Sequence, residues 1–242
     1  MHVHGRRPWH SCTRIGYVSG MLPVALIDEA TALSTEFGGL RITFDEQVLR
    51  SRAWTVAQSR WGAELLRAAP TTTSLLELCT GAGHIGLLAV VLERPRTHRL
   101  VAVDRSRVAC EFARRNAVLA GLEDRVEVRE GLIDGVIDPD DRFELVIADP
   151  PWVARAHTSR FRDDPVLAID SGDDGLDVAW SCLAAAEAHL VDGGSLLLQL
   201  GSLQQVDRVA EGLVARSSAL TIHEIRTFDG HGVLVRIVRE VA

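Results

Sequence analysis

From residue 73 onward, the chain alternates between short apolar runs and longer stretches in which apolar residues recur every three to four positions. The apolar runs predict strands near Ser74–Cys79, Leu100–Asp104, Val126–Arg129, Leu145–Ala148, Ser195–Leu200, Leu220–Ile225 and Gly232–Val238. The periodic stretches predict helices near Gly83–Leu92, Arg107–Leu119, Leu176–Leu190 and Leu203–Ala215. Regular alternation of strand and helix predicts an α/β fold, a doubly wound Rossmann-like parallel sheet with helices on both faces.

The last two predicted strands have no helix between them. Only a short connection containing Phe228, Asp229 and Gly230 separates them, so we expect them to pair as an antiparallel hairpin. The sheet would then have seven strands, one of which runs opposite to the others.

The N-terminal part predicts smaller elements. Residues 22–34 suggest a short amphipathic helix, and residues 40–49 suggest two short strands joined near Asp45 and Glu46. Thr55 and Gln58 have the spacing of a capping box, which predicts a helix from there to about Ala69. We therefore expect a flexible arm over 1–20, a helix, hairpin and second helix over 21–70, and the main domain over 71–242.

Composition narrows the class of protein. The chain has 242 residues, 47% hydrophobic and 24% charged, as expected for a globular domain. The net charge of −7 disfavours nucleic-acid binding without a local basic face. All basic residues are arginine, which excludes lysine-based covalent chemistry. No apolar run is long enough to span a membrane and no secretory signal is evident, so we expect a cytoplasmic protein without membrane contact.

Metal binding and disulfides are not indicated. The four cysteines lack pair spacing, and the N-terminal histidines have no second cluster to complete a site. The remaining histidines have no ligand spacing, and we expect most of them to face solvent: His84, His98, His157, His189, His223 and His231. His157 lies in a basic loop with Arg155, Arg160 and Arg162, where contact with a substrate and simple solvation remain open.

The stretch LLELCTGAGHIGLLA (75–89) places a glycine turn between a strand and a helix. Gly81 and Gly83 allow close backbone approach to a ligand, and the pattern is typical of dinucleotide sites. Asp104 ends the next strand, where a carboxylate suits ribose hydroxyls, although it can also cap the next helix. Ser106 can make that cap equally well. NAD and S-adenosylmethionine both fit, and the acidic Glu77 favours the cationic S-adenosylmethionine.

The stretch IADPPW (147–152) ends the fourth predicted strand, next to the same crevice. Pro150 and Pro151 stiffen the turn and leave carbonyl oxygens free to accept hydrogen bonds. Asp149 adds a side-chain acceptor, and Trp152 offers a flat face for stacking. Together they suit a planar nitrogen group whose lone pair is aimed at a methyl donor.

These motifs resemble those of class I S-adenosylmethionine-dependent methyltransferases that carry an Asp/Asn-Pro-Pro-aromatic motif. Within that class the chain is most similar to the HemK/PrmC-type protein-glutamine methyltransferases. The narrower resemblance rests on VLRSRAWT (48–55), DPVLAIDSGDDGLD (164–177) and GGSLLLQLG (193–201). It covers roughly residues 40–240.

The resemblance implies a strand order 3-2-1-4-5-7-6 with a short N-terminal helix and hairpin as a cap. It implies that the cofactor, S-adenosylmethionine, contacts Glu77, Cys79, Gly81, Gly83, Asp104, Arg105 and Asp149. The catalytic positions that it implies are Asp149, Pro150, Pro151 and Trp152. Arg52, Thr55 and Trp152 would contact the substrate.

The chain departs from the family pattern at several points. Asp149 and Trp152 stand where relatives usually have Asn and Tyr, and this pair also occurs in enzymes that methylate the exocyclic amine of adenine. Ser51 replaces a proline, and Cys79 replaces the first glycine of the turn. The acidic residue expected near the adenine ring is not evident, because Glu130 and Asp134 flank a position occupied by Gly131 or Leu132. About 39 residues precede the predicted hairpin, fewer than the helical domain of release-factor methyltransferases.

We therefore expect transfer of a methyl group from S-adenosylmethionine to a nitrogen, first of all the side-chain amide of glutamine in a protein partner. The alternatives are an adenine amine in RNA or DNA, a small-molecule amine, and a cofactor-binding protein without activity. The sequence leaves the oligomeric state open.

Overall fold

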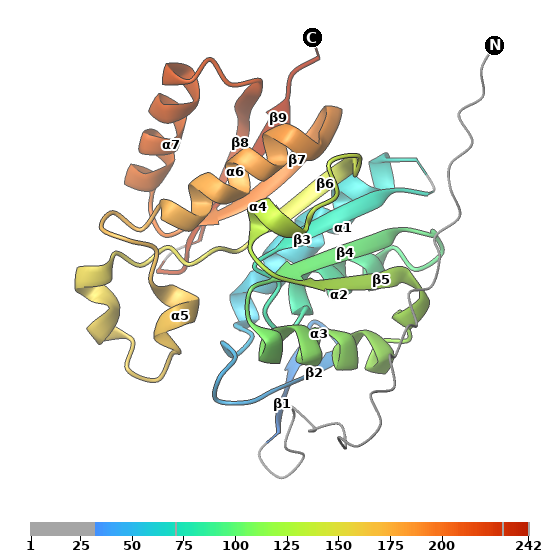
Figure 1. Ribbon diagram of the computed structural model, residues 1–242. Helices are drawn as coiled ribbons and strands as arrows, with labels where there is room; N and C mark the ends of the chain where they lie inside the picture. Colours follow the sequence, from blue (N-terminus) through green and yellow to red (C-terminus); the bar gives the residue numbers. More distant parts are fainter. Residues whose placement is uncertain (1–31, 71, 229, 242) are drawn as a thin grey trace, which may run out of the picture.

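A seven-stranded sheet forms the centre of the computed structural model, which describes residues 32–70, 72–228 and 230–241 (Figure 1). Its strands are β3 (Ser74–Leu78), β4 (Arg99–Asp104), β5 (Val126–Glu130), β6 (Phe143–Ala148), β7 (Leu190–Leu200), β8 (Leu220–Phe228) and β9 (Gly232–Arg239). They lie in the order β5-β4-β3-β6-β7-β9-β8, and β9 runs antiparallel to both neighbours. The expected order and the closing hairpin are confirmed.

Helices cover both faces of this sheet (Figure 1). They are α1 (Val56–Ala68), α2 (His84–Leu92), α3 (Arg107–Leu119), α4 (Ile133–Val136), α5 (Val166–Ile169), α6 (Asp177–His189) and α7 (Leu203–Ala215). One core cluster contains Trp61 and Phe112 from α1 and α3, and the other contains Leu183 and Val209 from α6 and α7. Within β3, Leu75 packs into the first cluster and its neighbour Leu76 into the second, as alternation along a strand requires.

The structure contains short helical elements that hydrophobic periodicity does not reveal. Helices α4 and α5 have four residues each, and a 3-10 helix covers Arg155–Arg160. Fewer than two turns cannot establish a helical period. No helix within the described ranges is both long and apolar enough to cross a bilayer.

The N-terminal hairpin differs from the prediction. It consists of β1 (Leu33–Phe37) and β2 (Leu40–Phe44), joined by Gly38 and Gly39 at φ of 57° and 93°. Of the two strands predicted within 40–49, the first is found as β2 and the second does not form, because the hairpin turn is made by the two adjacent glycines before β2. The predicted helix is wrong at residues 33–34, which belong to β1. Its residues 22–31 and the proposed arm over 1–20 lie outside the described residues.

The hairpin is fastened to the main sheet through Asn116 of α3. The Asn116 side chain accepts a hydrogen bond from the Thr43 amide (2.8 Å) and donates to the carbonyls of Thr43 and Ala82 (2.9 Å each). Ala82 lies in the turn between β3 and α2. The hairpin therefore fixes the segment that follows it near the carboxyl ends of the strands.

Helix α1 begins where predicted, but not for the predicted reason. Thr55 makes no capping hydrogen bond to the helix, so the capping-box interpretation is wrong. Gln58 instead points into the protein and donates to the carbonyls of Ala148 (3.0 Å) and Leu197 (3.1 Å). Burial of Gln58 makes these strand carbonyls its partners, and the contact braces α1 against the carboxyl end of β6.

Candidate functional site

The turn between β3 and α2 has an unusual backbone. Cys79, Gly81 and Gly83 all have positive φ, at 58°, 53° and 82°. Glycine tolerates this conformation, whereas Cys79 adopts it at a cost of roughly 1 kcal/mol. Cys79 is the position at which the resemblance expects glycine. A Cβ on Gly81 would meet no atom within 4 Å, so the turn presents open backbone there.

Glu77 lies beneath this turn and holds it. Its carboxylate accepts hydrogen bonds from the Gly86 amide (2.8 Å) and from the hydroxyl of Thr80. A Cβ on Gly86 would lie 2.6 Å from Glu77 Oε2, so glycine is needed there to admit the carboxylate. Burial raises the pKa of Glu77 to about 7.

A cavity of about 370 Å³ lies at the carboxyl ends of β3, β4 and β6, and we call it the cofactor cavity. Five of the seven predicted cofactor-binding residues line it: Cys79, Gly81, Asp104, Arg105 and Asp149. Glu77 and Gly83 do not line this cavity, and they determine instead the conformation of the turn between β3 and α2. Its volume falls within the range of pockets that take small molecules.

Asp104 occupies the rim of this cavity at the end of β4. Its carboxylate accepts hydrogen bonds from the amides of Gly81 and Ser106, each at 2.8 Å. The Ser106 hydroxyl caps α3 by accepting from the Ala109 amide (3.3 Å). Ser106 therefore supplies the side-chain cap, and Asp104 faces the cavity. Burial raises the pKa of Asp104.

The far wall of the cofactor cavity comes from the segment after β5. Gly131, Leu132, Ile133 and Asp134 line it. The Gly131 amide donates to the Asp104 carbonyl (2.9 Å), which ties this segment to β4. Of the two acidic residues that flank the expected adenine position, Asp134 lines the cavity and Glu130 does not.

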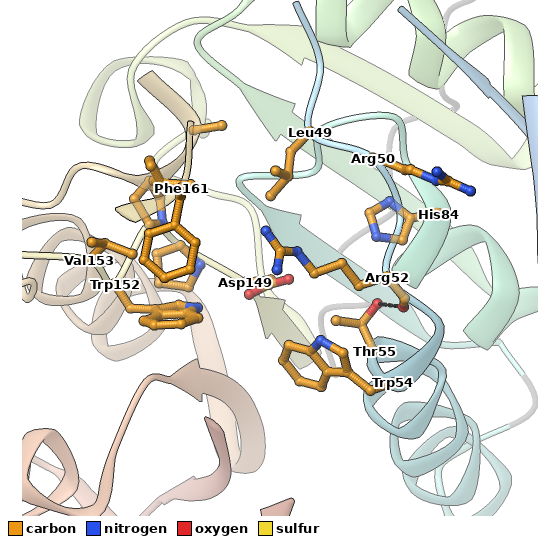
Figure 2. Close-up of a pocket in the computed structure, with 14 residues that line it drawn as sticks. Leu49, Arg50, Arg52, Trp54, Thr55, His84, Asp149, Trp152, Val153 and Phe161 are labelled. Carbon is orange, nitrogen blue, oxygen red and sulfur yellow. Dashed lines mark hydrogen bonds between the residues drawn. The ribbon is translucent and has the colours of Figure 1, made fainter. Parts of the chain in front are cut away.

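A smaller cavity of about 50 Å³ adjoins the first, and we call it the acceptor pocket (Figure 2). The two cavities share the lining residues Leu49, His84, Asp149, Pro151 and Ala168. The acceptor pocket also contains all the remaining predicted catalytic and substrate residues, namely Arg52, Thr55, Pro150 and Trp152. The structure thus brings segments around residues 50 and 150 together at one point.

Asp149 stands where the two cavities meet. Burial raises the pKa of its carboxyl to about 7, and the nearby Arg52 guanidinium opposes that shift. No hydrogen-bond partner of the Asp149 side chain is found in the described part of the chain. A desolvated acceptor without a partner, at the junction of two cavities, is suited to bind an N–H group from a ligand.

Trp152 is held in place from behind. Its ring meets Phe161 edge to face, with centroids 6.3 Å apart and planes at 85°. A Cβ on Gly201 would come within 2.4 Å of the ring, so this glycine makes room for it. Gln205 donates to the Trp152 carbonyl (3.0 Å) and accepts from the Gly201 amide (2.8 Å). Sequence reasoning missed Gln205, because nothing in its surroundings marks it.

Arg52 and Thr55 belong to the segment that covers the acceptor pocket. The Thr55 hydroxyl donates to the Arg52 carbonyl (2.8 Å), and the Arg52 guanidinium pairs with Asp164 at 2.5 Å. Figure 2 shows the Arg52 side chain extended toward Asp149. Trp54 lies between Arg52 and Thr55 in the sequence and stacks on His231, with ring centroids 5.7 Å apart. The ion pair therefore joins the segment around Arg52 to the loop after β6, 112 positions further along the chain.

His84 is another residue that the sequence analysis missed, since the expectation of a solvent-facing side chain is wrong. It lines both cavities, and its ring meets Phe37 edge to face with centroids 4.8 Å apart. Burial lowers its pKa to about 4, so the ring is neutral at physiological pH. His98, also expected outside, is fully buried. The position of His84 directly after Gly83 was the available signal.

Comparison with known proteins finds similarity to methyltransferases. The model of the family described as "Methyltransferase small domain" matches residues 59–164. A release factor glutamine methyltransferase from Deinococcus radiodurans is 38% identical over 68% of this chain and 58% of its own length. A ribosomal protein uL3 glutamine methyltransferase from Bradyrhizobium diazoefficiens is 33% identical over 67% of this chain and 54% of its own. The chain thus spans little more than half the length of these relatives.

Among solved structures, the hMettl16 catalytic domain in complex with MAT2A 3′UTR hairpin 6 superposes with a TM-score of 0.63. The match covers 84% of this chain and 76% of that one, at 14% sequence identity. At this identity the likeness concerns the fold.

Proposed function

We propose, from the premise that the chain belongs to the HemK/PrmC-like class I methyltransferases, that it methylates the side-chain amide nitrogen of a protein glutamine. The methyl donor is S-adenosylmethionine. The observation that carries the proposal is the position of Asp149, whose carboxylate stands where the cofactor cavity meets the acceptor pocket and has no hydrogen-bond partner among the described residues. The glutamine methyltransferases among the relatives support the choice of acceptor.

The cofactor cavity fits S-adenosylmethionine in size and in chemistry. Asp104 offers a carboxylate to ribose hydroxyls, and Asp134 lies on the wall proposed for the adenine end. Gly81 exposes backbone, and His84 brings a buried Nδ1 that has no partner in the described residues. Asp149 and Asp104 make the cavity negative, which suits the cationic sulfonium and ammonium groups. When bound, the cofactor supplies an electrophilic methyl group.

The acceptor pocket would orient the attacking nitrogen. Asp149 and the Pro150 carbonyl accept its N–H groups, and Trp152 packs against the plane of the amide. An amide nitrogen is a weak nucleophile, because its lone pair is delocalised. Hydrogen bonds that polarise the N–H group in a site with little water raise its reactivity in the transition state.

The reaction releases one proton. As the bond from nitrogen to the methyl carbon forms, the bond from that carbon to sulfur breaks, and the nitrogen loses a hydrogen. Asp149 is the titratable group shared by both cavities whose pKa, at about 7, suits proton uptake near neutral pH. His84, with a pKa of about 4, is far less basic.

Methylation of an adenine amine is the second candidate. The observation that favours it is the pair Asp149 and Trp152, found at positions where the glutamine enzymes usually have Asn and Tyr. Phe161 lies against Trp152 and adds a second aromatic side chain to the pocket. A ring acceptor would stack on such side chains.

Asp149→Ala tests the proposed function. We expect labelled methyl transfer to a glutamine peptide to disappear, while calorimetric titration still shows binding of S-adenosylmethionine, weakened only by the loss of one of the carboxylates that line the cofactor cavity. Asp207→Ala removes an exposed carboxylate from α7, outside the lining of both cavities, and is the matched control. An adenine-containing oligonucleotide runs in parallel as acceptor. Equal loss of binding and turnover would contradict the role of Asp149, and methylation of the oligonucleotide alone would support the second candidate.

A further inference from the structure

A second groove opens beside the acceptor pocket. It has a volume of about 530 Å³ and lies between residues 50–53, residues 160–164 and Thr35 and Glu36. It shares Arg50, Arg52 and Phe161 with the acceptor pocket, and it shares no lining residue with the cofactor cavity. A ligand in the acceptor pocket that continues outward along this side therefore enters the groove.

Four arginines line it: Arg50, Arg52, Arg160 and Arg162. Arg52 pairs with Asp164. In the part of the chain that the structure describes, Arg50, Arg160 and Arg162 form no ion pair or hydrogen bond, and all three are exposed. Guanidinium groups that line one groove and have no partner among the described residues are suited to bind an anion in a fork of two hydrogen bonds. We name this feature the arginine groove.

The groove also contains acidic residues, which limits the kind of anion. Glu36 and Asp163 line it beside the arginines, and the whole chain carries a net charge of −7. A nucleic acid would bring a regular row of phosphates past these carboxylates. A peptide places single carboxylates opposite single arginines, which avoids the repulsion. The mixed lining therefore favours an acidic peptide over a nucleic acid.

We propose that the arginine groove binds an acidic segment of the protein substrate, close in sequence to the methylated residue. This proposal rests on the proposed function, since it assigns the acceptor to a protein. An extended peptide advances about 3.3 Å per residue, so the two adjoining cavities take residues only a few positions apart. Substrate choice would then depend on side chains outside the acceptor pocket.

The test uses three synthetic peptides with one central glutamine. Three aspartates precede the glutamine in the first peptide and follow it in the second, and the third has asparagines at all of these positions. We measure kcat/KM for labelled methyl transfer at low and at high salt. One of the aspartate peptides should be methylated about tenfold better than the asparagine peptide, as several weak charge pairs would give, and salt should remove the difference.

The variant is Arg160→Glu combined with Arg162→Glu. It should abolish the preference for aspartate and leave the rate on the asparagine peptide unchanged. Arg142→Glu combined with Arg208→Glu makes the same change of charge at exposed sites outside the groove and should keep the preference. Equal rates on all three peptides would overturn the proposal while the proposed function stands.

Binding separates the two hypotheses if no peptide is methylated. Fluorescence anisotropy then compares the labelled aspartate peptides with a single-stranded RNA of equal length. Binding of an aspartate peptide that depends on Arg160 and Arg162 would support the groove although the proposed function fails. Preferential binding of the RNA through the same arginines would overturn the peptide proposal.

Discussion

The substitution Asp149→Asn separates the charge of this side chain from its shape. Burial raises the pKa of Asp149 from 3.8 to about 7 in the folded protein. An acid with a raised pKa holds more protons in the folded chain than in the unfolded chain. Stability therefore falls as the pH rises from about 4 to 7 and is constant above that range. Asparagine fills the same volume and does not titrate.

The full shift corresponds to about 4 kcal/mol, since one pKa unit is worth about 1.4 kcal/mol. Much of this free-energy difference develops between pH 5 and pH 8, and water that enters the cavities reduces its size. We expect the advantage of the asparagine variant in free energy of unfolding to grow by about 2 kcal/mol from pH 5 to pH 8. For a domain of this size that is a relative gain in Tm of roughly 4–8 °C. Glu77 titrates in both proteins. Because Asp149 adds to the effect of burial, which raises the pKa of Glu77, the substitution lowers that pKa somewhat and changes the difference in the same direction.

Thermal or urea unfolding at pH 5, 6, 7 and 8 measures this difference. Activity provides a second reading, because kcat/KM of the parent enzyme should rise with pH through about 7, whereas the variant should be nearly independent of pH. Gln204→Asn, which changes an exposed side chain of α7 that does not titrate, is the control and should give a difference that does not change with pH. A constant difference between the asparagine variant and the parent would refute the argument that the Asp149 carboxylate is desolvated.

Two other substitutions test local features. Gly86→Ala should destabilise the fold by about 2 kcal/mol and weaken S-adenosylmethionine binding, because the added Cβ displaces the buried Glu77 carboxylate. Urea unfolding and calorimetric titration measure the two effects. Gly135→Ala is the control, since a Cβ there meets nothing within 4 Å. Ser217→Gly should stabilise the protein by roughly 0.5–1 kcal/mol, since this exposed residue follows α7 with φ of 50°, a conformation that glycine adopts freely. Urea unfolding measures the gain, and unchanged activity separates it from any effect on the site.

Hydrophobic periodicity and helix caps predict the main sheet and helices, because each of these patterns lies within a single strand or helix. Helices α3 and α7 begin and end at the expected residues, and each has a serine cap, Ser106 and Ser202, before an amphipathic run. The sequence offers two candidate turns for the N-terminal hairpin, one at Gly38 and Gly39 and one near Asp45. The prediction places the hairpin at the second, whereas the structure has it at the first. A local sequence pattern identifies the correct hairpin turn only when a neighbouring segment has fewer residues that favour a turn.

The site is predictable only in part, for a different reason. The glycine turn, Asp104 and Asp149 follow strand ends, and in parallel sheets these meet at one edge. The contact of Arg52 with Asp164 and the support of Trp152 by Gln205 join residues far apart in sequence. No pattern within a segment encodes such pairs. They depend on how the loops after β6 and the segment after β2 fold back over the sheet.

Three acids gather at this edge, the buried Glu77 and the half-buried Asp104 and Asp149, and this clustering has an energetic consequence. Burial is the main cause of the raised pKa of Glu77, and the nearby Asp149 and Asp104 raise it further. Such a cluster costs stability in the absence of a cation, because the charges are desolvated and repel one another. Only Arg52 opposes the shift at Asp149. A cationic cofactor would offset that cost, so the same carboxylates that weaken the fold favour S-adenosylmethionine over a pyrophosphate-containing dinucleotide.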